Sequence, residues 1–213
     1  MIELSKHQRV SPELKEAALW HRKIYKECRS CGIRQQGIRV VLWRGEIPSD
    51  FTLIGEAPGE AENTLGYPFL GPAGKLLDEI IEEALEKGSH RGSSLSYSIT
   101  NLAGCWPRDS EELSSGTTRA PTATEARACS DRLIDFLDMA DPRLIVTLGS
   151  PAKKLLPSHE SWLAKGVELP RLQAVVNIIH PSAILRTPSK VEAGMSFKRA
   201  VVTLSDALAR LRS

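Results

Sequence analysis

Hydrophobic positions along the 213-residue chain follow two periods, which predict helices and strands in alternation. Apolar side chains at helical spacing predict helices over residues 11–28, 75–88, 122–141 and 196–212, with a short one at 151–156. The ends of these segments carry matching signals. Ser11 can cap the first helix, Thr122 and Glu125 have capping-box spacing, and Gly88 stands where the second helix ends.

Four largely apolar segments have the length of buried strands. They cover residues 51–58, 96–104, 142–150 and 173–182. Because these runs alternate with helices, they predict a parallel sheet with helices on both faces. We therefore expect an α/β fold, a three-layer α/β/α sandwich with a central four-stranded parallel sheet. No linker or repeat interrupts the pattern, so residues 1–213 are expected to form a single domain.

Unusual residues gather where the predicted strands end, which is where open parallel sheets bind ligands. Phe69 lies in a loop rich in glycine and proline, Asn101 offers an amide donor and acceptor, and His180 follows an apolar run. Together these groups suit a flat heterocycle, although Phe is common in cores, Asn in turns and His at strand exits. The sequence motifs of P-loops and of nucleophile-elbow hydrolases are absent.

Composition narrows the class of protein but does not name a ligand. The net charge is only +2, so binding to a polyanion would need local clustering of basic residues. No apolar run is long enough to span a bilayer, and the N-terminal residues lack the apolar stretch of a signal peptide. We expect a cytoplasmic protein without a membrane partner.

Four cysteines are present, at positions 28, 31, 105 and 129. A disulfide framework is not expected in a reducing cytosol. The Cys28–Cys31 pair has the C-x-x-C spacing of a metal or redox site. Spacing alone leaves a metal site and a redox pair with two ordinary buried thiols equally open.

Several motifs, in this order, resemble those of the uracil-DNA glycosylase superfamily, closest to family 4, the iron–sulfur enzymes of bacteria and archaea. They are "CRSC", "GEAPGEAEN", "GYPFLGPAGKLLD", "TNLAGCWP", "APTATEARAC", "RLIVTLG" and "HPSAILR", and they extend over most of the chain. The resemblance implies a monofunctional uracil-DNA glycosylase of base excision repair. Such a hydrolase removes uracil from DNA by cleaving the N-glycosidic bond.

The resemblance also implies roles for individual residues. Phe69 would stack on the flipped base, Asn101 would bond its O4 and N3, and His180 would donate to O2 as charge builds on the leaving uracil. The glycine-rich loop would let backbone touch the base and the phosphodiester. The implied substrate-binding residues are Gly55, Glu56, Ala57, Phe69, Asn101 and His180, and the implied catalytic ones are His180, Glu56 and Glu62.

The same resemblance assigns the cysteines and the DNA contacts. Cys28, Cys31, Cys105 and Cys129 match the ligands of a [4Fe–4S] cluster, with zinc as the alternative metal, and the cluster would tie the N-terminal helix, residues 11–28, to the loop after Asn101. Uracil-containing DNA is the implied partner of a monomer. The implied DNA contacts are Lys153, Ser182, Ile184, Leu185 and Arg186, with Ile184 or Leu185 filling the gap left by the base.

Two departures from the family pattern keep other functions open. Asn63 replaces the usual Asp, and residues 110–119 form an insertion without histidine. The segment "LWRGEIPSD" also departs from the usual glycine-rich sequence before the first strand. Gly59 stands where relatives with a "GQDPY" loop block thymine with Tyr, so that means of rejecting thymine is missing. One alternative is a catalytically altered or inactive relative, such as a phage-encoded protein, that binds DNA or a replication or repair protein. Another is a glycosylase for a different deaminated or modified base.

Overall fold

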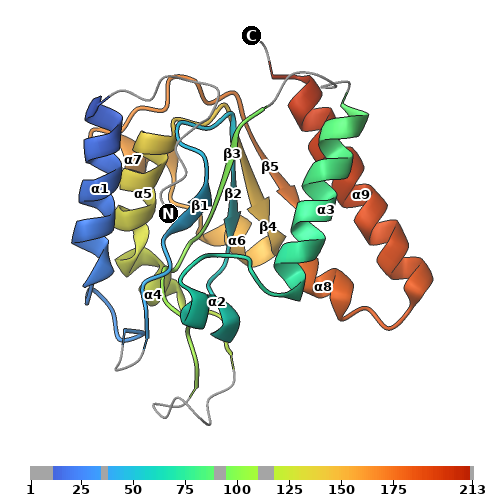
Figure 1. Cartoon of the computed structure of the whole chain (residues 1–213), viewed down its shortest axis with the longest axis horizontal. Coiled ribbons are helices and arrows are strands. Elements are labelled where there is room, and N and C mark those ends of the chain that lie inside the picture. Colours follow the sequence, from blue (N-terminus) through green and yellow to red (C-terminus); the bar gives the residue numbers. More distant parts are fainter. Residues whose placement is uncertain (1–11, 35–37, 89–94, 110–117, 212–213) are drawn as a thin grey trace.

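The computed structural model describes residues 12–34, 38–88, 95–109 and 118–211 (Figure 1). The described helices are α1 (Pro12–Lys26), α2 (Glu60–Leu65), α3 (Pro72–Lys87), α4 (Ala123–Ala128), α5 (Ser130–Ala140), α6 (Gly149–Leu155), α7 (His159–Ala164), α8 (Pro181–Leu185) and α9 (Lys190–Ala209). The described strands are β1 (Trp43–Gly45), β2 (Phe51–Gly55), β3 (Tyr97–Asn101), β4 (Leu144–Leu148) and β5 (Ala174–Ile178).

The strands form one sheet in the order β1-β3-β2-β4-β5. β3, β2, β4 and β5 are parallel, as the sequence predicts, and β1 adds a fifth strand that runs antiparallel to β3. In the register of β2 and β3, Gly55 lies opposite Asn101. The carboxyl ends of the four parallel strands therefore meet at one edge of the sheet.

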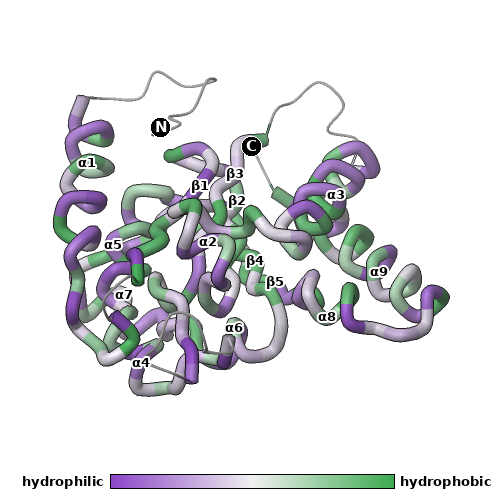
Figure 2. Tube along the Cα trace, turned by 60° about the horizontal axis from the view of Figure 1, so that its bottom comes forward, coloured by the Kyte–Doolittle hydropathy of each residue, from purple (hydrophilic) through white to green (hydrophobic). Residues whose placement is uncertain are grey.

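Two helical layers cover the sheet, which confirms the predicted sandwich. Figure 1 shows α1, α5 and α7 on one side of the strands and α3 and α9 on the other. Alternate side chains of a strand point to opposite layers, so Leu53 packs in the core with α3 and α9 while Ile54 packs in the core with α5. Figure 2 shows the hydrophobic strands between helices whose polarity alternates along their length.

Several elements differ from the sequence prediction. β1 is absent from the strands predicted from the sequence, because its three residues are too few to show a strand period. The helix expected over 122–141 is interrupted at Cys129, which ends α4 and precedes α5. Its capping box is confirmed, since Thr122 Oγ1 accepts from the Glu125 N–H. The proposed cap Ser11 lies outside the described residues.

Helix α1 is fixed to the body of the protein by its own contacts. Ala18 is fully buried against the core that includes α5. His21 Nε2 lies 3.0 Å from the Arg132 carbonyl oxygen, and the Tyr25 hydroxyl donates to Asp135. These contacts attach α1 to the rest of the protein independently of the metal cluster expected from the sequence. Among the described helices, none is long and apolar enough to cross a membrane.

The loop before α3 depends on a glycine inside the helix. A Cβ at Gly74 would overlap the carbonyl group of Phe69, which is backbone and cannot rotate away. Phe69 itself has a φ of +57°, a conformation that a bulky L-residue adopts only when its surroundings hold it. The first turn of α3 thus packs directly on the strained backbone of the Phe69 loop.

Replacing Gly74 with Ala should destabilise the protein by about 1–3 kcal/mol, because the added methyl forces the Phe69 loop to move. The matched control is Gly194→Ala in α9, where a Cβ meets nothing within 4 Å. That variant should gain about 0.5–1 kcal/mol from helix propensity. Urea unfolding midpoints measure both changes, and a stabilised Gly74→Ala variant would contradict the packing described.

Candidate active site

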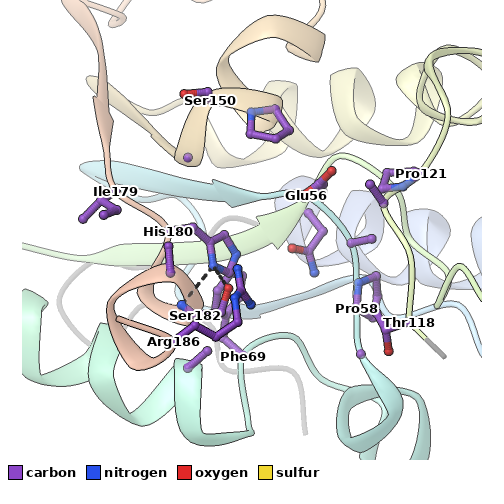
Figure 3. A pocket seen from close by; sticks show the side chains of 18 of the residues that line it. Glu56, Pro58, Phe69, Thr118, Pro121, Ser150, Ile179, His180, Ser182 and Arg186 are labelled. Atoms are coloured by element: carbon purple, nitrogen blue, oxygen red, sulfur yellow. Dashed lines mark hydrogen bonds between the residues drawn. The ribbon is translucent and has the colours of Figure 1, made fainter. Parts of the chain in front are cut away.

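A pocket of about 870 Å³ opens at the carboxyl ends of the parallel strands, within the size range of ligand sites. It is lined by residues that follow β2, β3, β4 and β5, by the Phe69 loop and by residues 118–121. Figure 3 shows His180, Ser182, Arg186 and Phe69 together in this pocket, with Glu56 further along it. The site expected from the sequence at this edge of the sheet is therefore present as a real cavity.

The bottom of the pocket depends on the missing side chain of Gly55. A Cβ there would lie 2.5 Å from Phe69 Cζ and would overlap Asn101 Oδ1. The family resemblance implies that this glycine lets the backbone touch a base and a phosphodiester. The structure gives it another role, because Gly55 makes room for the Asn101 amide and the Phe69 ring to lie side by side.

Asn101 lines the pocket and carries an unsatisfied acceptor that is buried beside Gly55. Its side chain is 1% exposed, and its Oδ1 is buried without a hydrogen-bond partner among the described residues. Its backbone carbonyl accepts from the guanidinium of Arg132, which is also buried, so the end of β3 is held from behind. A buried acceptor without a partner costs about 1–3 kcal/mol, so a ligand N–H placed there would recover that energy.

The Phe69 ring is held in place by α3 and by β1. Arg44 of β1 donates to the carbonyl oxygens of Pro68 (3.0 Å) and Phe69 (3.4 Å) and pairs with Asp78 at 2.6 Å. The ring is 7% exposed and lies 5.8 Å from the His180 ring, centroid to centroid, with 33° between their planes. The two rings thus form neighbouring walls of the pocket.

His180 is a neutral imidazole with a defined tautomer. Its Nδ1 accepts from the Ser182 backbone N–H at 3.1 Å and lies 2.8 Å from the Ser182 hydroxyl. Because the backbone N–H can only donate, Nδ1 carries no proton, and the neutral ring must carry it on Nε2. Burial lowers the pKa of His180 from 6.5 to about 4, and the charge of Arg186 adds to this shift. At neutral pH, Nε2–H is therefore a hydrogen-bond donor.

The two candidate acids, Glu62 and Glu56, differ in their contacts. Glu62 Oε2 accepts from the Gly59 N–H at 3.0 Å, and Oε1 accepts from the Leu70 and Gly71 N–H groups at 3.2 Å. This carboxylate thus connects Gly59, before α2, to Leu70 and Gly71, before α3. Glu56 lines the pocket, and burial raises its pKa. Glu62 lines the pocket as well, but its two carboxylate oxygens are already engaged by the loop.

The segments after β4 and β5 bring only some of the expected DNA contacts to the pocket. Ser182 and Arg186 line it, whereas Lys153 is exposed on α6 and does not. Ile184 is 5% exposed and belongs to the core that includes α3 and α9, so it cannot enter a DNA duplex without leaving that core. Leu185 is 51% exposed, so it is free to make the expected contact, which stays a prediction.

Asn63 replaces an acid that the family pattern would place in α2. Its side chain is 7% exposed, and its Oδ1 accepts from the Arg39 backbone N–H at 2.8 Å. In this chain it connects α2 to the segment before β1. Asn63 does not line the pocket.

The four cysteines line one small cavity beside α4 and α5, and none of them lines the pocket at the strand ends. Cys129 Sγ accepts from the Gly104 N–H and from Arg132 Nε, each at 3.3 Å. Burial raises the pKa of the Cys105 thiol to about 12, a cost that a bound metal would remove by taking the thiolate. Within the described residues, however, no three His, Cys, Asp or Glu side chains lie close enough to hold a single metal ion.

Other residues that line the pocket or hold its walls carried no sequence signal. Arg44 belongs to the strand that was not predicted, and it acts through the loop that it holds. Arg199 of α9 lines the pocket from a helix whose start was placed several residues too late. Residues 118–121 form another wall, and its first two residues are the end of the insertion at residues 110–119.

A model of the uracil DNA glycosylase superfamily matches residues 43–205. The chain belongs to this superfamily. The match begins at β1 and runs into α9, so it includes the whole sheet and every pocket segment. The resemblance of the "GEAPG", "PF" and "HPS" motifs is thus confirmed at the level of the family.

Several relatives named type-4 uracil-DNA glycosylase are similar to most of the chain. The Saccharolobus solfataricus protein is 36% identical over 76% of this chain and 74% of its own length. The Archaeoglobus fulgidus protein is 30% identical over 81% of this chain and 85% of its own length. The Thermotoga maritima protein is 29% identical over 77% and 81%, respectively.

The low pKa of His180 predicts a pH dependence of stability. Because the unfolded chain binds this proton more readily, the stabilisation is fully present above pH 6.5 and is lost as pH falls from 6.5 towards 4. A His180→Gln variant should therefore lose less stability than the wild type between pH 6.5 and pH 5. Urea unfolding at both pH values measures this difference, and equal losses in the two proteins would contradict the buried neutral imidazole.

Proposed function

We propose that this protein removes uracil from DNA by hydrolysing the N-glycosidic bond. The proposal combines membership of the uracil DNA glycosylase superfamily with the names of its relatives, which are type-4 uracil-DNA glycosylases. The observation that carries it is the buried, unpartnered Asn101 Oδ1 beside the Phe69 ring. An acceptor next to an aromatic wall is what the edge and face of a pyrimidine with an N–H group require.

The base would be read by three groups. Asn101 Oδ1 accepts from uracil N3–H while its amide nitrogen donates to O4, and the Phe69 ring stacks on the base. Cytosine offers an acceptor at N3 and an amine at position 4, so it would place like groups against each other. His180 Nε2–H donates to O2, in the tautomer that Ser182 enforces.

Cleavage breaks the bond between N1 and C1′, and the electron pair stays on uracil N1. The sugar becomes oxocarbenium-like, and a water molecule then adds its oxygen to C1′ and releases a proton to solvent or to a carboxylate. Fixed donors that meet the developing charge on the base lower the barrier, because they need no reorganisation during the reaction. Glu56 is the proposed residue that positions water or faces the positive sugar.

DNA would approach over the pocket mouth. We assign Ser182 and Arg186 to the strand near the extruded nucleotide and Leu185 to the gap that it leaves. Arg199 lines the same pocket from α9, and its positive charge suits a nearby phosphate. Lys153 is exposed beyond the pocket and would contact only more distant phosphates.

The cysteines suit a [4Fe–4S] cluster. The four cysteine sulfurs surround one cavity, and in the described residues no three of them converge on one point. This spread suits a cluster of several irons better than a single zinc ion. Cys28, Cys31, Cys105 and Cys129 would hold it, and the N–H donors from Gly104 and Arg132 to Cys129 would stabilise a thiolate. The cluster would supply structural cross-linking between α1, the end of β3 and α4.

Uracil excision should fall by about 10²–10³-fold in both Asn101→Ala and His180→Ala, because each removes a contact to the charged leaving base. The measurement is the single-turnover rate of alkali-sensitive strand breaks in an oligonucleotide with one deoxyuridine. His159→Ala is the control, since His159 is exposed on α7 and lies outside the pocket. Full activity in both pocket variants would overturn the assigned roles, and an inactive, folded wild type would overturn the proposed reaction.

Protein purified without oxygen should be brown, with a broad absorbance at about 400 nm and about four irons per chain. Because the chain has only four cysteines, replacing Cys31 with Ser should abolish or destabilise the cluster with no thiol to substitute for it. Iron and zinc analysis of the same samples separates the alternatives. A colourless protein with one zinc ion per chain would contradict the cluster.

A further inference from the structure

The pocket wall formed by residues 118–121 is built from an antiparallel pair of segments. Arg108 and Thr118 form a β-bridge, the Arg119 N–H donates to the Pro107 carbonyl oxygen at 3.1 Å, and Trp106 Nε1 donates to Thr118 Oγ1 at 2.9 Å. Thr118, Arg119, Ala120 and Pro121 all line the pocket. Figure 3 places Thr118 and Pro121 on the side of Glu56 and Pro58, away from His180.

Arg119 joins this wall to the rest of the protein. Its two terminal nitrogens donate to the two Glu125 carboxylate oxygens at 2.7 and 2.8 Å, which is the bidentate geometry of a strong ion pair. Its Nε donates to the Arg108 carbonyl oxygen at 3.1 Å, and one terminal nitrogen also donates to the Ala120 carbonyl oxygen at 3.0 Å. These contacts are to the wall, to the segment paired with it at Arg108, or to Glu125 of α4.

Glu125, the partner of this guanidinium, lies in the first turn of α4. The same carboxylate accepts from the Thr122 N–H at 2.7 Å and so completes the cap of α4. The hydrogen bonds from Arg119 hold the pKa of Glu125 at about 2, so the carboxylate is charged at all working pH values. The Glu125 side chain is 14% exposed, and that of Arg119 is 34% exposed.

We propose that Arg119 is a positioning residue for the base pocket, which it serves by clamping residues 118–121 to α4 through Glu125. It does not contact the DNA backbone in this role, since four of its five N–H donors are already directed to protein acceptors. The wall that it fixes lies opposite the His180 donor, so its position sets how closely a flipped nucleotide is held. This inference rests on the proposed function, because it concerns the same pocket and the same substrate.

The decisive comparison uses two substitutions of opposite charge. Arg119→Gln removes a positive charge and Glu125→Gln removes a negative one, yet both break the same clamp. If Arg119 acts by positioning, each variant should raise KM for a deoxyuridine oligonucleotide by roughly tenfold while kcat changes less than about threefold. The double variant should be no worse than either single one, because both changes remove one interaction. Arg127→Gln, an exposed arginine in α4, is the matched control for lost charge.

Salt dependence separates positioning from phosphate binding. A clamp leaves the slope of log affinity against log salt unchanged, whereas loss of a phosphate contact lowers it by about one. A defect in Arg119→Gln alone with a reduced slope would overturn the inference, as would unchanged KM in both variants. Urea midpoints show whether either variant has unfolded, and Arg119→Lys, which keeps the charge without the fork, should still be impaired.

Failure of the proposed function can be told apart from failure of this inference. If the wild type releases no uracil, the reaction is wrong, and the same variants are then compared by their Kd for the deoxyuridine oligonucleotide in fluorescence anisotropy. The paired loss in Arg119→Gln and Glu125→Gln with an unchanged salt slope would still support the clamp. Equal binding by both variants and the wild type would reject it.

Discussion

The absence of a side chain at Gly55 is the constraint on which the pocket depends. Gly55 and Asn101 are the last residues of two paired parallel strands, so any Cβ on the first would strike the amide of the second and the ring of Phe69. With glycine there, an acceptor and an aromatic face come together at the bottom of a cavity. Neither group can relax away, because Arg132 holds the Asn101 carbonyl and Arg44 holds the Phe69 loop. The unsatisfied acceptor is therefore maintained in the free protein, at a cost that a bound N–H group would remove.

Much of the charge around the pocket braces the structure and leaves few groups for chemistry. Glu62 binds three backbone N–H groups of its loop, Arg44 pairs with Asp78, and Arg119 pairs with Glu125. Each of these side chains fixes a segment that carries a wall of the pocket. Fixing those segments costs conformational entropy during folding, so that little reorganisation is needed when a substrate binds. Among the acids that line the pocket, this leaves Glu56 without a bracing role in the described contacts.

The sequence predicted the parallel sheet and the edge that holds the pocket because both follow from hydrophobic period and strand order. It identified Phe69, Asn101 and His180 because their residue types and motif order are distinctive. It could not predict that Glu62 is engaged or that Ile184 is buried, since a motif gives a residue's position but not its contacts. Strand β1 was missed because three residues show no period, and with it the role of Arg44. The clamp at Arg119 joins residues that are close in sequence, but the fold of the insertion decides whether they meet, and the sequence pattern does not give that fold.

The arrangement of charge across the pocket matches the charge that the proposed reaction creates. Breaking the bond between N1 and C1′ gives a negative base and a positive sugar, so opposite charges are needed at the two sides of that bond. His180 is kept neutral by burial and by Arg186, and it donates without carrying a charge of its own. Arg186 and Arg199 supply positive charge to the pocket, while Figure 3 shows Glu56 on the side away from Arg186. A protonated His180 would be a stronger donor, but its Nδ1 could then no longer accept from Ser182, and the ring would lose the contact that orients it. Near neutral pH, this fold thus sustains a neutral, fixed hydrogen-bond donor among charged side chains whose positions are set before the substrate binds.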